Sequence, residues 1–268
     1  MNHMNALGVE SELFFHRLNG NVKKWGKYTL IYTKNCPDSY SGNSLLLENK
    51  PDIKNFYLFE ADFASLIGKP PEIQHRSFIW PMSIAENSDA SEFTHLGYEY
   101  SENLVLLAKK NDLIRPTKSK IQIEIKPYSS NEDWQKWEAM LLQDNAFPAN
   151  AYRCYLECQR HMYQSLIRHD QGNWWGAYID GEQVANLGLF FDGEIGRFQS
   201  VLTDPSFRNQ GICKALVHHV AVQGFSKVSA LLMVAEGSHH ALQLYQSLGF
   251  KAVEKYASLL WLPKASID

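Results

Sequence analysis

Hydrophobic and polar positions predict a regular series of strands and helices in the second half of the chain. Residues 121–126, IQIEIK, alternate apolar and polar side chains as a half-buried strand does, and the next stretch repeats apolar residues at helical spacing. Two Asp-Gly pairs, at 180–181 and 192–193, separate three apolar runs, which predicts an antiparallel meander. The expected order is strand, helix, helix, three strands, helix, strand, helix and strand. The expected strands are residues 121–126, 174–179, 184–191, 195–203, 228–235 and 256–262, and the expected helices are residues 129–144, 151–169, 213–225 and 238–250.

The chain also contains a weak internal repeat. When Gly97 is laid over Gly249, an offset of 152 residues, a Leu-Gly-aromatic turn followed by an apolar strand occurs at the same place in both halves. A polar segment with one proline, residues 115–120, lies where a repeat boundary is expected. The repeat predicts two related domains, residues 1–118 and residues 121–268.

Composition and charge argue against several classes of protein. With 45% hydrophobic and 21% charged residues, the chain has the composition of a folded globular protein rather than of a disordered one. Its 26 Lys and Arg against 29 Asp and Glu leave no basic excess, so we expect no nucleic-acid partner. No run approaches the roughly 20 apolar residues that span a bilayer, so we expect no membrane partner.

Cysteine usage and the N-terminal sequence indicate a cytoplasmic protein without a metal. The four cysteines are too few and too scattered for a disulfide framework, and residues 1–13 lack the basic segment and apolar core of a leader. Cys154, Cys158 and His161 share one face of an expected helix, but no fourth ligand is evident, and tetrahedral sites want four. We interpret these cysteines as buried thiols on a helix face.

Residues 201–216, VLTDPSFRNQGICKAL, join an expected strand to an expected helix through a polar loop. The first amides of a helix have no partner within it, and together with the positive end of the helix dipole they bind anions such as a pyrophosphate. Gly211 has no Cβ and would let the backbone approach such a group closely. A plain strand-to-helix connection with a solvated Arg208 is the alternative interpretation.

This loop resembles the cofactor-binding motif of the GNAT superfamily of acyl-CoA N-acyltransferases, which reads Arg or Gln, two residues, Gly, one residue, and Gly or Ala. Arg208, Gly211 and Cys213 occupy the three positions. Cys213 departs from the Gly or Ala of the family, although it is small enough to keep close packing. The order of elements from Ile121 onward is similar to that of the family as well.

The segment 238–250, SHHALQLYQSLGF, resembles the second signature of the family, which reads Asn, Ala, Tyr and then Gly-Phe. Ser238 stands where Asn is commoner. The matching residues are Ala241, Tyr245, Gly249 and Phe250. The resemblance implies an α/β (α+β) fold, a GNAT-like mixed and mostly antiparallel sheet flanked by helices, in two tandem copies of which the N-terminal one is degenerate.

The resemblance also implies acetyl-CoA as co-substrate and no metal. In the family, the last strand of the meander splays from the next strand, and the pantetheine arm pairs with strand backbone in the gap. Here these strands would be residues 195–203 and 228–235. The residues that the resemblance assigns to the cofactor are Val201, Thr203, Arg208, Asn209, Gln210, Gly211, Ile212, Cys213, Lys214, Ser238 and Ala241.

Tyr245 is the catalytic residue that the resemblance implies, because a phenol near the thioester can protonate or hydrogen-bond the departing sulfur. The alternative is a tyrosine that only packs in the seam of its helix. The base is left open, because residues 195–203 hold no Asp, Glu or His. Gln199 or Ser200 could hold a water, and Glu194 and Glu236 at strand ends are the remaining candidates.

We therefore expect an acetyl-CoA-dependent N-acetyltransferase that transfers its acetyl group directly to a primary amine of a small-molecule or peptide acceptor. A non-catalytic acyl-CoA-binding sensor or regulatory protein is the main alternative, and an interaction module without the cofactor is a third. The first half carries Phe93 at the offset from Tyr245 and has no Arg-x-x-Gly motif of this kind, so we expect that copy to be inactive. The acceptor and the oligomeric state are left open.

Overall fold

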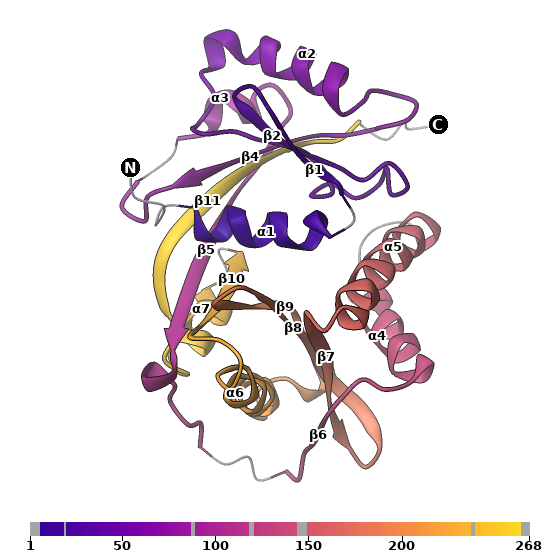
Figure 1. Cartoon of the computed structure of the whole chain (residues 1–268), viewed down its shortest axis with the longest axis vertical. Helices are drawn as coiled ribbons and strands as arrows, with labels where there is room; N and C mark the ends of the chain where they lie inside the picture. The colour runs from indigo at the N-terminus through magenta and orange to yellow at the C-terminus, as the bar shows by residue number, and fades with distance from the viewer. Residues whose placement is uncertain are drawn as a thin grey trace. The chain divides into compact units, whose positions relative to one another are not determined.

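The computed structural model describes residues 6–18, 20–86, 89–117, 121–143, 149–236 and 239–263. Contacts divide the chain into two units, one made of Met1–Leu104 with Glu254–Asp268 and the other of Val105–Val253. Two strands, β5 (Glu99–Lys109) and β11 (Lys251–Trp261), have residues in both units (Figure 1). The division by contacts thus lies within strands, whereas the repeat in the sequence places a domain boundary between residues 118 and 121.

The chain from Ile121 onward contains the predicted strands and helices in the predicted order, and all of them except the last strand lie in the second unit. Its first predicted strand starts at Glu124 rather than at Ile121, and the strand that ends the series starts at Lys251 rather than at Tyr256. The Asp180-Gly181 pair turns with φ of 51° and 83°, the left-handed geometry that a tight hairpin needs. The elements are η2 (Lys110–Asp112), β6 (Glu124–Pro127), α4 (Asn131–Gln143), α5 (Ala149–Arg168), β7 (Gly172–Ile179), β8 (Glu182–Asp192), β9 (Ile195–Thr203), η3 (Pro205–Phe207), α6 (Ile212–Gly224), β10 (Ala230–Glu236) and α7 (His239–Gln246).

Five strands of this unit lie side by side in the order β6-β7-β8-β9-β10. They are antiparallel up to β9, while β9 and β10 are parallel. Side chains of β8 alternate between two faces that both carry helices, since Leu189 packs against Gly224 of α6 and the ring of Phe190 lies 5.5 Å from that of Tyr163 in α5 (Figure 1). Burial on both faces explains why β8 is apolar at most of its positions, and Oδ1 of the buried Asn186 accepts a hydrogen bond from Trp174 Nε1.

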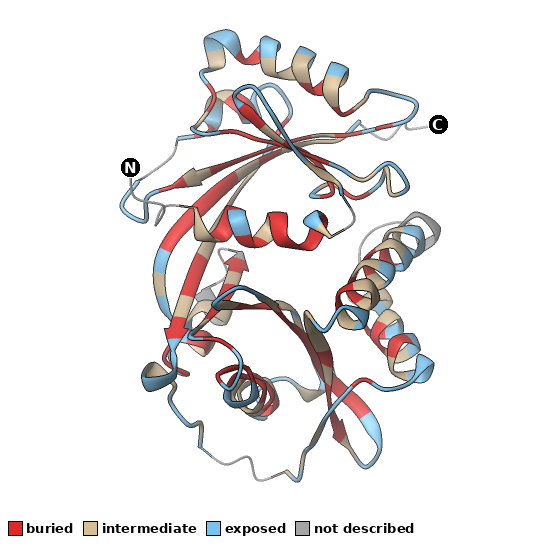
Figure 2. Ribbon diagram, in the orientation of Figure 1, coloured by how far each residue is buried: buried red, intermediate tan, exposed pale blue. Residues whose placement is uncertain are grey.

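The first unit contains the N-terminal elements and most of β11. Its strands lie in the order β1-β2-β3-β4-β11, in which only β3 and β4 are parallel. Aromatic side chains fill its core, and Phe56, Phe63 and Phe78 are each at most 1% exposed. Figure 2 colours the buried residues of the chain red. Its elements before β5 are α1 (Leu7–Arg17), β1 (Val22–Trp25), β2 (Tyr28–Tyr32), β3 (Asn43–Leu46), η1 (Ile53–Asn55), α2 (Phe56–Leu66), β4 (Arg76–Met82) and α3 (Ser91–Thr94).

Local structure repeats at the offset found in the sequence. Strands β5 and β11 are both 11 residues long, and each follows a glycine with positive φ, 87° at Gly97 and 96° at Gly249. The amide after each glycine donates to the carbonyl five residues earlier, from Tyr98 to Phe93 at 3.1 Å and from Phe250 to Tyr245 at 3.2 Å. Both helix ends therefore use the same glycine-dependent cap, which accounts for the repeated Leu-Gly-aromatic sequence.

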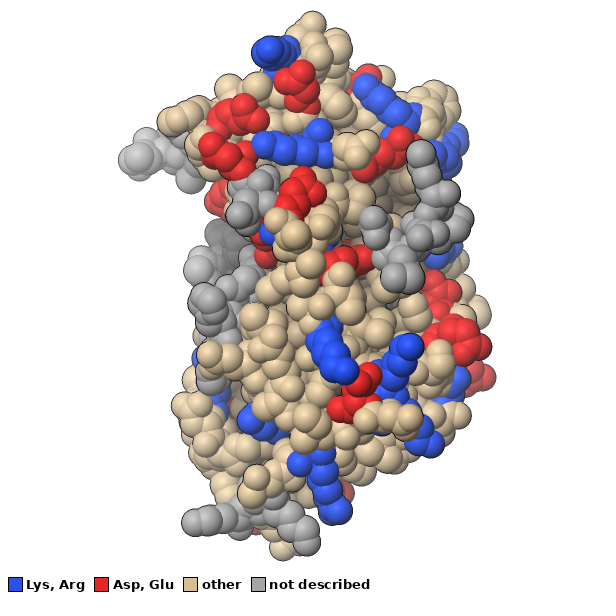
Figure 3. Space-filling view, turned by 90° about the vertical axis from the view of Figure 1, so that its left-hand side faces the viewer, with Lys and Arg blue, Asp and Glu red and all other residues tan. Residues whose placement is uncertain are grey.

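Among the described residues, no helix is long and apolar enough to span a membrane, and no group of three His, Cys, Asp or Glu is placed to hold a metal ion. Lys and Arg are interspersed with Asp and Glu on the face drawn in Figure 3. Cys154 is an exposed free thiol, so the prediction of a buried thiol was wrong at this position. The buried face of α5 passes through Leu156, and Cys154 lies about 200° from it around the helix.

Candidate active site

Strands β9 and β10 are paired only over their first residues. Residues 230–232 of β10 pair with residues 195–197 of β9. Beyond this point β9 continues to Thr203 and β10 to Glu236, with no pairing between them in the described part of the chain. The backbone N–H and C=O groups that face this gap are not used by a ladder between the two strands, so an extended ligand can pair with them.

A bulge turns β9 where it leaves β10. The pairing with β8 shifts between Asn186, which faces Leu202, and Gly188, which faces Gln199, so β9 holds one extra residue in this interval. Ser200 lies within the interval and has a φ of 46°, which is uncommon for a residue other than glycine. Because a bulge bends its strand and increases its twist, it accounts for the separation of β9 from β10 on this side.

The loop between β9 and α6 is held by its own side chains. Asp204 Oδ1 accepts a hydrogen bond from the Ser206 amide at 2.8 Å. Arg208 Nε donates to the Thr203 carbonyl at 3.2 Å, and Gln210 Nε2 donates to the Ser206 carbonyl at 3.3 Å. These bonds order the path of the loop before any ligand binds.

The start of α6 is open. Asn209 and Gly211 have φ of 63° and 80°, and Gly211, the N-cap residue, has no side chain with which to cap the helix. A Cβ built on Gly211 would meet no atom within 4 Å, so the space in front of the backbone is clear. The first amides of a helix, here those of residues 212–214, are groups of the kind that can bind an anion.

Thr203, Cys213 and Tyr245 come together from β9, α6 and α7. The sulfur of Cys213 is enclosed by protein, although the residue as a whole is half-buried, and burial raises the pKa of the thiol to about 11 against smaller opposite effects of the Thr203 hydroxyl and Lys214. Tyr245 is 8% exposed, and burial, followed by the nearby Cys213, raises the pKa of its phenol. Cys213, the residue that departs from the motif, is therefore the link between the loop and the tyrosine.

Two hydroxyls of this cluster lack a hydrogen-bond partner among the described residues. Thr203 Oγ1 is buried and has no hydrogen-bond partner in the described part of the protein, since its approach to the Cys213 thiol does not reach hydrogen-bond geometry. The Tyr245 hydroxyl makes no hydrogen bond with a described residue. A buried polar group without a partner costs free energy, so a bound molecule that supplies one is favoured here.

Comparison with known proteins identifies this region. The acetyltransferase (GNAT) family matches residues 133–250, a range that contains β9, the loop after it, α6, β10 and α7. Residues 133–250 form a GNAT acetyltransferase domain. In general terms, this family supports an acyl-CoA-dependent acyltransferase activity for the GNAT domain. No curated protein matches the chain.

Solved structures share the fold over most of the chain. A functionally unknown conserved protein from Staphylococcus epidermidis is 16% identical, with a TM-score of 0.70, and the match covers 90% of this chain and 92% of that one. A GCN5-related N-acetyltransferase from Kribbella flavida is 15% identical, with a TM-score of 0.64 and 98% of each chain covered. A tandem GNAT protein from the clavulanic acid biosynthesis pathway is 10% identical, with a TM-score of 0.55, covering 81% of this chain and 73% of that one.

At these identities the likeness shows the fold alone. That fold is the expected one, a GNAT-like mixed and mostly antiparallel sheet flanked by helices, and a two-domain layout fits it.

The structure reduces the number of residues that could act as the general base in the GNAT domain. Glu194 precedes β9 at the end opposite Thr203, and nine residues of extended strand separate them by roughly 30 Å. This distance excludes Glu194 from chemistry beside Tyr245. Glu236 ends β10, and its side chain lies outside what the structure describes.

Tyr163 is a residue of this region that the sequence analysis missed. It is 2% exposed, and its hydroxyl accepts a hydrogen bond from Gln199 Nε2 at 3.0 Å. The ring of Tyr163 lies 4.7 Å from that of Trp174, so Gln199 is held by a side chain fixed in the core. Helical periodicity could have placed Tyr163 in the core, but its partner on β9 depends on how α5 packs on the sheet.

The remaining expected residues are distributed over the same elements. Val201 is half-buried in the bulged end of β9, and Ala241 is half-buried in α7. The side chain of Ile212 is 1% exposed, so only its amide can face a ligand. Lys214 is half-buried in the first turn of α6, and Ser238 lies outside the described residues.

Proposed function

We propose that the GNAT domain is an acetyl-CoA-dependent N-acetyltransferase that acts in the cytoplasm and transfers acetyl directly to a primary amine of a small molecule or peptide. The observation that carries this proposal is the divergence of β9 from β10 beside the start of α6, whose N-cap residue is Gly211. The divergence offers strand backbone to an amide-bearing arm, and the helix start offers amides to an anion. Acetyl-CoA has both parts, a pantetheine arm and a pyrophosphate.

The residues of the site would divide this ligand between them. In this proposal the pantetheine arm pairs with the backbone of Val201 and Thr203, and the pyrophosphate lies at residues 208–214, where Gly211 leaves clear space. Ser238 and Ala241 complete the cofactor site beside α7. Bound acetyl-CoA supplies the thioester whose carbonyl carbon the amine attacks, so that a C–N bond forms and the C–S bond breaks.

Tyr245 acts on the leaving sulfur in this proposal. Burial raises the pKa of Tyr245, so its hydroxyl keeps its proton through the neutral range and is present as a donor at Oη. A donor near the sulfur stabilises the charge that develops as the C–S bond breaks, and the proton can then pass to the thiolate. The proton of the attacking amine goes to solvent, because residues 195–203 offer no Asp, Glu or His to receive it.

A non-catalytic acyl-CoA-binding sensor is the second candidate, and one observation favours it. Gln199, the polar side chain of β9 that could hold a water, already donates to Tyr163. A site that binds the thioester without activating an amine would serve as a sensor.

We propose further that residues 1–118 are a degenerate copy without acetyl-CoA. Phe93 in α3 occupies the place of Tyr245, is fully buried, and has no hydroxyl. In the loop after β3, Asp52 Oδ1 accepts a hydrogen bond from the Lys54 amide at 3.0 Å. Asp204 makes the same bond to the Ser206 amide at the same offset of 152 residues, so this carboxylate occurs in both copies and the loss of the Tyr245 hydroxyl is what distinguishes the first.

Thermal unfolding with and without acetyl-CoA or CoA tests the proposal first. A ligand at about 100 times its dissociation constant adds roughly 2.7 kcal/mol, which for a protein of this size raises Tm by roughly 5 to 11 °C. A rise with both ligands supports the pyrophosphate site, and release of CoA thiol in a screen of amines then separates a transferase from a sensor. No rise with a folded protein contradicts both candidates.

Gly211→Glu and Gly181→Glu form a matched pair for this test. Both glycines have positive φ, 80° and 83°, and a Cβ at either position meets no atom within 4 Å. The two variants therefore carry the same backbone strain and the same added charge. We expect only Gly211→Glu to lose the ligand-induced rise in Tm, and an equal loss in both would show that strain rather than the site is responsible.

A further inference from the structure

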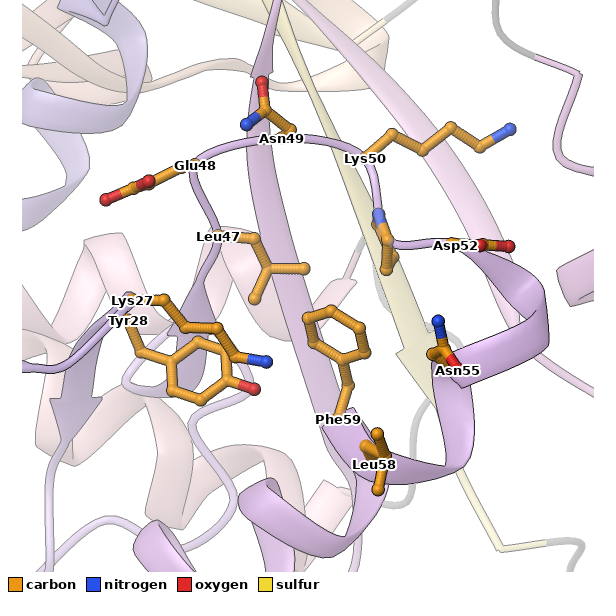
Figure 4. A pocket seen from close by; sticks show the side chains of 11 residues that line it. Lys27, Tyr28, Leu47, Glu48, Asn49, Lys50, Asp52, Asn55, Leu58 and Phe59 are labelled. Carbon is orange, nitrogen blue, oxygen red and sulfur yellow. The ribbon is translucent and has the colours of Figure 1, made fainter.

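A pocket of about 430 Å³ lies wholly within the first unit, away from the GNAT domain's matched range. It is bounded by the turn between β1 and β2, by the loop after β3 and by the first turns of α2 (Figure 4). Its volume falls within the range of small-molecule sites. The side chains that decide its chemistry are those of Lys27, Tyr28, Leu47, Asn55, Leu58 and Phe59.

The floor of the pocket is apolar, and polar side chains line its rim. Tyr28 and Leu47 are 3% and 5% exposed, and the rings of Tyr28 and Phe59 meet edge to face with centroids 6.1 Å apart. Leu58 is 45% exposed at the mouth of the pocket. Exposure of its apolar surface to water is unfavourable, and a bound ligand would cover that surface. The Tyr28 hydroxyl donates to Asp62, so this hydroxyl already has a partner.

One charge is directed into this apolar space. The amino group of Lys27 points toward the centre of the pocket, whereas Glu48, Lys50 and Asp52 point away from it (Figure 4). Lys27 Nζ lies 4.6 Å from the centroid of the Phe59 ring and 5.0 Å from that of Tyr28. Contact with two ring faces holds the ammonium in place without neutralising its charge.

The other charged residues of the rim have partners of their own. Glu48 accepts from Lys24 at 3.4 Å, Lys50 Nζ donates to the Asp89 carbonyl at 2.6 Å, and Asp52 accepts from an amide of its own turn. Within the described part of the chain, Lys27 makes no ion pair or hydrogen bond. The charge left for a ligand to match is therefore a single positive one.

These features exclude two kinds of ligand. An amine would have to compete with Lys27 for the ring faces and would be repelled by its charge. An uncharged apolar molecule would leave the ammonium unmatched.

We propose that this pocket binds a small carboxylate with an apolar body. The carboxylate pairs with Lys27 Nζ, the apolar body packs against Leu47 and Phe59, and the Asn55 amide lies at the edge for a second polar group. The site is separate from the transfer reaction and does not rest on it.

Titration calorimetry of the full chain tests the pocket with three probes that share one body, 3-phenylpropionate, 3-phenylpropanamide and 3-phenylpropylamine. We expect saturable binding of the carboxylate at or below about 10 mM, weaker binding of the amide and none of the amine. Equal binding of the carboxylate and the amine, or no saturable binding of the carboxylate in this range, overturns the proposal.

Lys27→Met removes the charge and keeps an apolar stem. It should weaken binding of the carboxylate by about tenfold and change that of the amide by less than about twofold. Lys23→Met is the matched control, because Lys23 is on β1, contacts the Trp25 ring at 4.9 Å and does not line the pocket. An equal loss in both variants would show a general effect of charge and would overturn the assignment to Lys27.

Leu58→Glu tests the same pocket from its mouth. Leu58 is 45% exposed, so this substitution adds a negative charge without filling the core. It should weaken the binding of 3-phenylpropionate by about fivefold or more, because the added charge repels the carboxylate, and it should weaken the binding of the amide less. Unchanged binding of the carboxylate would place the ligand elsewhere and contradict the proposal.

Discussion

Replacing Tyr245 by Phe removes one hydroxyl and leaves the ring in its packing. The residue is 8% exposed, and its hydroxyl makes no hydrogen bond with a described residue. No acceptor is left unpaired by the substitution, so we expect the free energy of unfolding to change by less than about 0.5 kcal/mol. Loss of a general acid lowers turnover by about 10²- to 10⁴-fold, a rise in the barrier of about 2.7 to 5.4 kcal/mol.

The assay is release of CoA thiol with saturating acetyl-CoA and the amine that reacts fastest in the screen. Because burial raises the pKa of Tyr245 above its ordinary value of 10.0, its hydroxyl stays protonated at every pH below that value. The ratio of wild-type to variant turnover should therefore be constant from about pH 6 to 9. Affinity for CoA, measured by the rise in Tm, should be unchanged.

Tyr98→Phe is the control for this experiment. Tyr98 is 3% exposed, and its hydroxyl donates to Glu60 Oε1 at 2.8 Å. Its loss should lower stability by about 1 to 3 kcal/mol, because a partly buried carboxylate loses a donor, and it should leave turnover unchanged. Equal turnover of Tyr245→Phe and wild type at every pH would refute the role of the tyrosine, as would a loss of turnover matched by a loss of stability.

Three further substitutions test other parts of the reasoning. Gly211→Glu should weaken the binding of CoA by more than about tenfold, because a carboxylate roughly 5 Å from a phosphate costs about 3 kcal/mol at an effective dielectric constant of about 20. Gly181→Glu should leave the binding of CoA unchanged, and competition binding measures both variants. Thr203→Val removes a buried hydroxyl without a partner, so it should raise the Tm of the ligand-free protein and weaken the binding of CoA. A lower Tm without ligand would contradict the assignment of Thr203 as a hydroxyl without a partner. Burial raises the pKa of Glu254 above its usual 4.5, so the folded state keeps a proton that the unfolded state loses. Stability in urea should accordingly fall as pH rises from 4.5 through the folded value, and Glu254→Gln should show less of this fall; parallel curves for the two proteins would refute it.

Short-range features of the sequence determined which elements form and in what order. Alternation in residues 121–126, the Asp-Gly pairs and the mostly apolar run of residues 184–191 each predicted an element that the structure contains. These signals arise from backbone preference and from which faces are buried. A few neighbouring residues are enough to indicate each of these two properties. The two errors at strand starts, Glu124 and Lys251, occur where pairing with another strand rather than local pattern sets the limit.

The sequence by itself also determined which functional groups the candidate site contains, since the loop with Gly211 and the phenol of Tyr245 can both be identified in it. Only the tertiary structure decided that Cys213 lies between Thr203 and Tyr245, and that β9 leaves β10 after residue 197. Only the tertiary structure directed the ammonium of Lys27 into an apolar pocket. The physical reason is distance along the chain: residues 203, 213 and 245 belong to three elements, and their meeting depends on how those elements pack, which no local pattern encodes.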